Sequence, residues 1–292
     1  MKNNMNRVGF IGYGSMGSML VNGFLKAEVI APEEMVISTR SITKLEAITD
    51  QWKGITVSSD NRSVAGESDL LFLCVKPLDV LPIMHEIASD LKISTHLVSI
   101  AACVTLNDIE NQFPGPVTKI IPSLTSEVKE GTSLLCHNAE VSDDKKERLE
   151  NLLGAISKVV HIKETDFEAA ADLTSCAPGL FAAIFENFVQ AGLRHSEIPP
   201  DVAHQMVVST LFGTAKLMAE KGIGFSDMVH RVATKGGITE EGVKVLNTHL
   251  PSVFDEVFLK TLSKYDSVKD MIKQLKDNPA AAGDGAKNVR RP

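Results

Sequence analysis

The chain has 292 residues, of which 43% are hydrophobic and 23% charged, and 30 Lys and Arg against 37 Asp and Glu leave a net charge of −7. That length accommodates two domains with buried cores, and the acidic balance disfavours a nucleic-acid or anionic-membrane surface. The 4 cysteines lie far apart in the sequence, as is usual in the reducing cytosol. Since no apolar stretch reaches the ~18 residues of a membrane span, we expect a cytoplasmic enzyme with no nucleic-acid or membrane partner.

Short apolar runs alternate with helical patterns over the first half of the chain. Strands are predicted at residues 8–11, 35–38, 70–75, 97–101 and 119–121, and helices at 16–26, 42–52 and 80–91. A further strand, helix and strand follow at 133–136, 143–156 and 158–162. Continuous apolar strands are typical of a sheet buried on both faces, so the pattern predicts a doubly wound, mainly parallel α/β domain over residues 1–163.

Strand signals stop after Glu164, and helices are predicted at 167–177, 180–194, 201–221, 226–234, 239–250 and 253–276. Asp201 is the candidate N-cap of the third of these helices, and Gly222 is its candidate end. Apolar residues cover more than one stripe of that helix, which is typical of burial between other helices, often across a subunit interface. We expect an all-α domain over residues 164–279 and a disordered tail at 280–292.

A glycine-rich turn follows the first predicted strand and opens a helix. Its sequence is Gly12-Tyr13-Gly14-Ser15-Met16-Gly17. The first glycine allows a tight turn, the second lets backbone approach a pyrophosphate, and the third permits close helix–strand packing. The free N–H groups of the helix start favour phosphate, so all six residues are predicted to bind a dinucleotide.

The end of the second strand indicates which dinucleotide is bound. An NAD site usually has an acidic residue there, whereas this chain has Thr39, Arg40 and Ser41, followed by Lys44. These hydroxyl and cationic groups suit a 2′-phosphate, which favours NADPH, with NADH as the alternative. The competing interpretation is that Arg40 and Lys44 mark a solvated helix start.

Two further turns carry candidate binding groups. Val75, Lys76 and Pro77 follow the strand at 70–75, where the carboxyl ends of parallel strands meet a cofactor. In the helical region, Thr234-Lys235-Gly236-Gly237-Ile238-Thr239 opens a helix. Its backbone N–H groups and the Thr239 hydroxyl form a receptor for a carboxylate, although a simple Gly-Gly turn with Thr239 as N-cap fits the pattern equally well.

The remaining candidate groups point away from metal or thiol chemistry. The sequence has no His-x-x-x-His or His-Glu-x-x-His motif, so we expect no metal site. His204 and His230 fall on predicted helices as surface or packing residues. Cys176 lies at a helix start, where a thiolate nucleophile is conceivable, but a small residue that allows close packing is the favoured interpretation.

Taken together, these segments resemble the pyrroline-5-carboxylate reductase family, in which a nicotinamide cofactor reduces a cyclic imine to proline. The matching stretches are residues 8–17, 38–44, 72–77, 97–105, 121–122, 172–178 and 235–242. The resemblance implies an N-terminal Rossmann domain, a helical dimerisation domain, and a homodimer or a ring of dimers. It also implies that Ala101 contacts the cofactor, that Gly236, Gly237 and Ile238 bind substrate through backbone groups, and that Thr239 is catalytic. Thr174, Ser175 and Cys176 correspond to the other wall of the substrate pocket.

The chain departs from the family pattern in its pocket loops. Ile121-Pro122-Ser123-Leu124-Thr125-Ser126 replaces Met-Pro-Asn-Thr-Pro-Ala, and Thr174-Ser175-Cys176-Ala177-Pro178-Gly179-Leu180 replaces Ser-Gly-Ser-Gly-Pro-Ala-Tyr. In the Ser-Pro-Gly-Gly-Thr-Thr loop, Lys235 replaces Pro and Ile238 replaces the first Thr. These features resemble a divergent branch, the late competence protein ComER of spore-forming bacteria, for which a regulatory role is suspected.

The sequence therefore favours NADPH-dependent reduction of 1-pyrroline-5-carboxylate to L-proline. One alternative is a ComER-like regulator that binds NADPH without efficient turnover. A β-hydroxyacid dehydrogenase has a similar glycine loop, but such enzymes need a lysine on the interdomain helix, and positions 169–193 contain none.

Overall fold

The computed structural model describes residues 7–41 and 43–277, and it divides into two compact units. The sheet unit comprises residues up to 176 together with those from 261 onwards, and the helical unit comprises residues 177–260. The helical unit is thus inserted into the sequence of the sheet unit. In the described residues, no helix combines the length and apolar character needed to cross a membrane.

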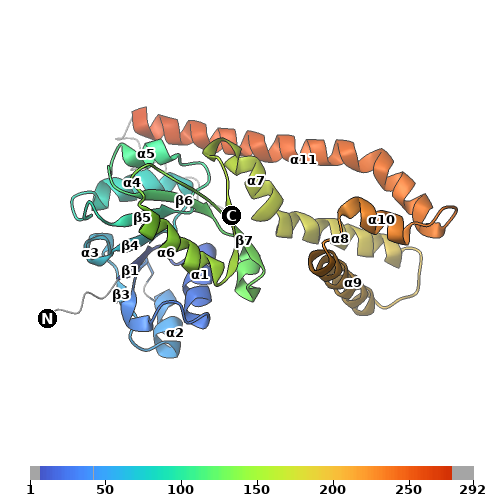
Figure 1. Ribbon diagram of the computed structural model, residues 1–292, viewed down its shortest axis with the longest axis horizontal. Coiled ribbons are helices and arrows are strands. Elements are labelled where there is room, and N and C mark those ends of the chain that lie inside the picture. The colour runs from blue at the N-terminus through green and yellow to red at the C-terminus, as the bar shows by residue number, and fades with distance from the viewer. Residues whose placement is uncertain (1–6, 42, 278–292) are drawn as a thin grey trace. The chain divides into compact units, whose positions relative to one another are not determined.

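The sheet unit is built on eight strands in the order β3-β2-β1-β4-β5-β6-β7-β8 (Figure 1). The strands are β1 (Val8–Ile11), β2 (Met35–Ser38), β3 (Thr56–Ser58), β4 (Leu70–Leu73), β5 (His96–Ser99), β6 (Val117–Ile121), β7 (Gly131–His137) and β8 (Ser157–His161). Neighbouring strands pair in parallel except β6 and β7, which are antiparallel. The prediction of a doubly wound, mainly parallel sheet is confirmed.

Helices cover both faces of this sheet. One face carries α1 (Ser15–Lys26), α2 (Thr43–Gln51) and α6 (Asp143–Gly154), and the other carries α3 (Asn61–Glu67), α4 (Pro77–Ile87), α5 (Leu106–Glu110) and the C-terminal part of α11. Phe10 on β1 stacks on Phe72 of β4 with ring centroids 4.8 Å apart, in the core under α1. The short helices η1 (Pro32–Glu34), η2 (Leu124–Val128) and η3 (Glu164–Asp166) lie in connecting segments.

The helical unit contains α8 (Ala177–Leu193), α9 (Pro200–Lys221), α10 (Phe225–Val232) and the first part of α11 (Ile238–Asp277). Two predictions here were wrong. Pro199 caps α9 and Pro200 occupies its first turn, so Asp201 is already helical; Gly222 does end the helix, with a φ of 61°. The predicted helices at 239–250 and 253–276 form one helix that continues through Pro251, because removing one backbone donor does not outweigh the remaining hydrogen bonds of a 40-residue helix.

The helix α7 (Phe167–Thr174) belongs to the sheet unit by its contacts. Phe167 and Ala171 pack against Ile121 of β6 and Leu134 of β7. Ile272 of α11 is buried in the core on the face that carries α4, and Tyr265 of α11 packs against both that core and the α7 cluster. The division was expected at residue 163, but residues 164–176 and those from 261 onwards belong to the sheet unit. The boundary at residue 163 stays a prediction about function. The predicted tail at 280–292 lies outside the described residues.

Candidate active site

The glycine-rich turn lies at the carboxyl end of β1, where its three glycines are constrained differently. Gly12 has a φ of +102°, and a Cβ there would lie 2.4 Å from the carbonyl oxygen of Cys74. A Cβ on Gly17 would lie 2.4 Å from the carbonyl oxygen of Gly12, so only glycine lets α1 start this close to β1. At Gly14, in contrast, a Cβ would meet no atom within 4 Å. The backbone at Gly14 is open on the side where a ligand can approach.

The start of α1 is free to bind an anion. Gly14 is its N-cap and offers no side-chain acceptor, and its first turn has no acidic residue. Ser15, Met16 and Gly17 form that turn, in which the helix supplies no acceptor for the N–H groups. Tyr13 is half-buried beside it, and its hydroxyl accepts a hydrogen bond from Asn22 Nδ2 at 3.3 Å. The turn therefore presents donors and a positive dipole end without its own carboxylate.

Arg40 lies just beyond the end of β2, next to the strand that carries the glycine turn. Its side chain is 80% exposed, and Nη2 lies 4.0 Å from the Asp79 carboxylate on α4. The Ser41 hydroxyl shares a 3.0 Å hydrogen bond with the Thr43 hydroxyl, and Thr39 is half-buried. The side chain of Lys44 lies outside the described part of the chain. An exposed guanidinium beside hydroxyl groups is suited to a phosphate monoester.

The turn between β4 and α4 lies at the same sheet edge as the glycine turn. Lys76 is the N-cap of α4 and Pro77 its first residue. A Cβ on Gly12 would also lie 2.9 Å from Val75 Cγ1, so the two turns are in close contact. Burial raises the pKa of the Cys74 thiol to about 12, which keeps it protonated and inert. At the end of β5, Ala101 N–H donates to Ser99 Oγ at 3.3 Å, and Ala101 is buried.

Thr174 and Ser175 lie against the segment that follows β6. Ser175 Oγ donates to the Pro122 carbonyl oxygen at 3.0 Å, and Ser123 Oγ donates to the Thr174 carbonyl oxygen at 3.3 Å. Thr174 Oγ1 donates to Ala170 O at 2.8 Å within α7. The hydroxyls of Thr174 and Ser175 therefore have partners within the sheet unit, and the bonds made by Ser175 and Ser123 tie the end of α7 to the sheet edge.

A polar cluster of Cys176, Tyr265, Asp172 and Thr261 was not predicted from the sequence. Cys176 Sγ lies 3.5 Å from the Tyr265 hydroxyl, and Thr261 Oγ1 donates to Asp172 Oδ2 at 2.5 Å. Burial raises the pKa of Cys176, the hydrogen bond with Tyr265 lowers it in part, and the Asp172 carboxylate raises it by a smaller amount. The thiol thus stays protonated, in agreement with a packing role rather than a nucleophile. Because Tyr265 follows Cys176 by 89 positions, no local motif joins them.

The loop at residues 234–239 lies in the helical unit at the start of α11. Gly236 adopts a φ of +73°, and its N–H donates to Glu240 Oε2 at 2.7 Å. Gly237 N–H donates to the Thr234 carbonyl oxygen at 2.8 Å. Ile238 is 95% exposed, and the exposed Thr239 is the second residue of the helix rather than its N-cap. The N–H groups of Ile238 and Thr239 belong to a first helical turn, which provides them with no acceptor.

Two family models match the chain in succession. Residues 7–103 match the model described as NADP oxidoreductase coenzyme F420-dependent, and residues 164–268 match the model described as pyrroline-5-carboxylate reductase dimerisation. The second match covers α7, the helical unit and the beginning of the return of α11 to the sheet unit.

Relatives and solved structures agree with these models. Pyrroline-5-carboxylate reductase 3 of Bacillus subtilis is 38% identical, over 92% of this chain and 98% of the relative. ComE operon protein 4 of the same organism is 28% identical over the same shares. The structure of a pyrroline-5-carboxylate reductase from Coxiella burnetii has a TM-score of 0.78 at 26% identity, over 93% of this chain and 99% of that one. The Plasmodium falciparum pyrroline carboxylate reductase with NADP bound has the same fold, with a TM-score of 0.78 at 21% identity, over 94% and 99%. Given this similarity along nearly the full length of both B. subtilis relatives, the chain belongs to the pyrroline-5-carboxylate reductase family.

Proposed function

We propose that this protein reduces 1-pyrroline-5-carboxylate to L-proline with NADPH. The observation that carries the proposal is the 38% identity with a pyrroline-5-carboxylate reductase over 92% of the chain. The open glycine turn at Gly14 and the exposed guanidinium of Arg40 agree with it, since together they provide a cradle for a pyrophosphate and a partner for a 2′-phosphate.

The cofactor-binding residues all lie in the sheet unit. We assign the pyrophosphate to the turn from Gly12 to Gly17, and the adenosine phosphate to the segment of Thr39, Arg40, Ser41 and Lys44. Val75, Lys76, Pro77 and Ala101 follow β4 and β5 at the carboxyl edge of the sheet, where they contact the nicotinamide half. When bound there, NADPH supplies the hydride that reduces the C=N bond.

The substrate residues are assigned to two loops. Ile238 and Thr239 donate their first-turn N–H groups to the substrate carboxylate, and the Thr239 hydroxyl orients the ring nitrogen. Gly236 and Gly237 shape this loop, since their N–H groups already have the intramolecular acceptors Glu240 and Thr234. Thr174, Ser175 and Cys176 of the sheet unit are assigned to substrate binding as well. The imine can arrive protonated as an iminium ion, so orientation and electrostatics carry the reaction without a strongly shifted acid.

The working form is a homodimer joined through the helical unit. The match of residues 164–268 to a dimerisation model supports this assignment. The exposed apolar side chains of α9 support it as well, because a second copy of the chain would cover them. The ring of dimers stays a prediction.

Turnover tests the proposal directly. Purified protein mixed with NADPH and 1-pyrroline-5-carboxylate should consume NADPH at about 1–10³ per second and produce proline. Thr239→Ala should lower kcat/KM by about 10- to 100-fold, the value of one hydrogen bond to a charged group, and leave NADPH affinity unchanged. The matched control is Thr248→Ala on the same helix, whose hydroxyl donates to Lys244 O at 2.9 Å. Equal losses in both variants would count against the role of Thr239.

A second candidate function is a regulator that binds NADPH and does not turn over the imine. The 28% identity with ComE operon protein 4 and the replacement of the first loop threonine by the exposed Ile238 favour it. Tight NADPH binding without consumption of any cyclic imine would select this alternative.

A further inference from the structure

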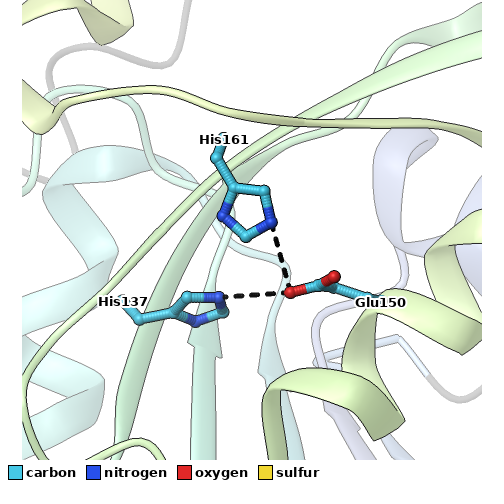
Figure 2. Close-up of side chains that lie close together, drawn as sticks. All are labelled: His137, Glu150 and His161. Carbon is cyan, nitrogen blue, oxygen red and sulfur yellow. Dashed lines mark ion pairs between the residues drawn. The ribbon is translucent and has the colours of Figure 1, made fainter. Parts of the chain in front are cut away.

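Two histidines and a glutamate converge on the face of the sheet unit that carries α6. Figure 2 shows the Nε2 atoms of His137 and His161 directed at one carboxylate oxygen of Glu150. The Nε2–Oε1 distances are 3.8 Å for His137 and 3.2 Å for His161. One potential ligand atom from each of the three residues lies within 4.8 Å of the others. Two imidazole nitrogens and one carboxylate form a donor set used by zinc.

The topology places this cluster far from the candidate cofactor site. Thr118, near the start of β6, pairs with His137 at the end of β7, because these two strands are antiparallel. His161 ends β8, which is parallel to β7, and Glu150 is on α6. The cluster therefore lies at the edge where β5 and β6 begin, opposite the carboxyl edge that carries the glycine turn. This arrangement separates it from the site described above.

A hydrogen-bond relay orients the His137 ring. His137 Nδ1 shares a 2.7 Å hydrogen bond with Thr118 Oγ1, which shares another 2.7 Å bond with His96 Nε2. If the Thr118 hydroxyl donates to His96, it accepts from His137 Nδ1–H. The lone pair of His137 is then on Nε2, which faces the cluster. A partner of this kind on the second ring nitrogen is characteristic of histidines that bind metals.

His137 Nε2 makes no hydrogen bond among the described residues, because Glu150 Oε1 lies 3.8 Å away. The side chain is 9% exposed, and Nε2 is a buried polar atom without a hydrogen bond in the described structure. The 3.2 Å contact between Glu150 and His161 leaves His137 Nε2 without a hydrogen bond. A cation bound by all three residues satisfies His137 as well.

We propose that His137, Glu150 and His161 bind a zinc ion that fastens α6 and the edge strand β8 to β7. Ligand atoms 2.0–2.1 Å from a tetrahedral zinc are about 3.3 Å apart, so only small side-chain movements are needed from the separations seen here. The nearby Lys146 ammonium is held by Asp143 at 2.8 Å. A water completes the fourth position, and the role is structural.

The test uses the full chain after removal of metals with a chelator. Titration with Zn²⁺ in a calorimeter should reveal a site of one equivalent, and Co²⁺ should develop the visible absorption of tetrahedral coordination. His161→Ala and Glu150→Ala should each weaken this site by at least about 10-fold. His85→Ala, which removes an exposed imidazole from α4 of the same unit, should leave it intact. Free zinc at ~100 times its Kd should raise the melting temperature by about 5 °C in wild type and His85→Ala only.

Thr118→Val examines the relay separately, because it keeps the side-chain shape and removes the hydroxyl. Zinc affinity should fall about 10-fold, the usual effect of losing a partner behind a metal-bound histidine. NADPH affinity, measured in parallel, should be unchanged in every variant that folds. Absence of zinc binding to wild type, or unchanged affinity in both His161→Ala and Glu150→Ala, would overturn the proposal whatever the reductase activity proves to be.

Discussion

The two units of this protein differ in how far their large apolar side chains are exposed. In the sheet unit, Phe10, Phe24 and Phe72 are fully buried within one cluster. In the helical unit, Phe188, Phe212 and Phe225 are 66%, 69% and 83% exposed, and α9 has no buried residue along its 22 positions. One unit completes its own core, whereas the other leaves many of its large apolar side chains exposed. Apolar side chains that are buried within one chain stabilise its fold, whereas those that stay exposed are available for contacts with another chain.

Truncating a phenylalanine in each unit should produce the largest contrast. Phe10→Ala removes a ring stacked on Phe72 and should lower the free energy of unfolding by about 3–5 kcal/mol. Phe225→Ala, at the exposed start of α10, should cost less than about 1 kcal/mol if that ring is solvated. Urea unfolding curves measure both values. A loss of several kcal/mol in Phe225→Ala would show that this ring too is covered in the assembled protein.

The assembly should be sensitive to charge on α9. Phe212→Glu places a carboxylate on an apolar face and should weaken self-association by at least about 2 kcal/mol, or some 30-fold, if Phe212 is central to the interface. Sedimentation velocity over a range of protein concentrations gives the dissociation constant. Gln51→Glu, at the exposed end of α2 in the sheet unit, adds the same single negative charge and is the control. If both variants sediment like wild type, the face of α9 is not the interface.

Acid should affect the two units with opposite sign. Burial lowers the pKa of His96 in the sheet unit to about 3, so the unfolded chain takes up a proton near pH 6.5 that the folded chain refuses. This contribution to stability is present above pH 6.5 and is lost as the pH falls toward 3; between pH 6.5 and 5 the loss should be about 1–2 kcal/mol. In the helical unit, the Pro200 carbonyl and then Glu186 raise the pKa of His204, so its contribution is present below pH 6.5 and is lost as the pH rises through the raised value. Unfolding of wild type and His96→Gln at pH 7 and 5 measures the difference, and a variant with the wild-type slope would contradict it.

The smallest effect concerns a residue of the sheet unit alone. Arg40→Gln should reduce the preference for NADPH over NADH by about 10-fold, since an exposed guanidinium contributes at the lower end of charged hydrogen bonds. Binding titrations with both cofactors measure the ratio. The oligomeric state should stay that of wild type, because every predicted cofactor residue lies outside the helical unit. An unchanged ratio would mean that Arg40 is simply part of a solvated helix start.

Local signals made most of the fold predictable. The strands β1 and β2 have the bounds that their unbroken apolar runs predict. The strand β3 lies at the sheet edge, where its three residues are only partly covered. It was missed because its sequence contains no apolar run. The helix α5 was missed although a signal was present, because Thr105 and Asp108 form a capping box. The break predicted between residues 250 and 253 is absent, since α11 continues through Pro251.

The candidate site divides along the same line. The glycine turn could be predicted because its roles follow from adjacent residues and steric limits. The contact of Ser175 with Pro122 and that of Cys176 with Tyr265 join segments 53 and 89 positions apart, so they depend on tertiary packing. The cluster of His137, Glu150 and His161 depends on the antiparallel entry of β7, which no short motif announces. A single sequence thus predicts a site whose residues are adjacent in the chain, but not a contact between residues that lie far apart in the chain.

The return of α11 to the sheet unit has a consequence for synthesis on the ribosome. Ile272 fills the core on the α4 face, and Lys276 pairs with the buried Asp108, yet both residues follow the whole helical unit in the chain. At roughly 5–20 residues per second, about 100 residues separate Cys176 from Ile272 by some 5–20 seconds of translation. For that interval the nascent sheet unit has an open apolar patch beside α4. Exposure to chaperones during translation is thus built into the order of the sequence.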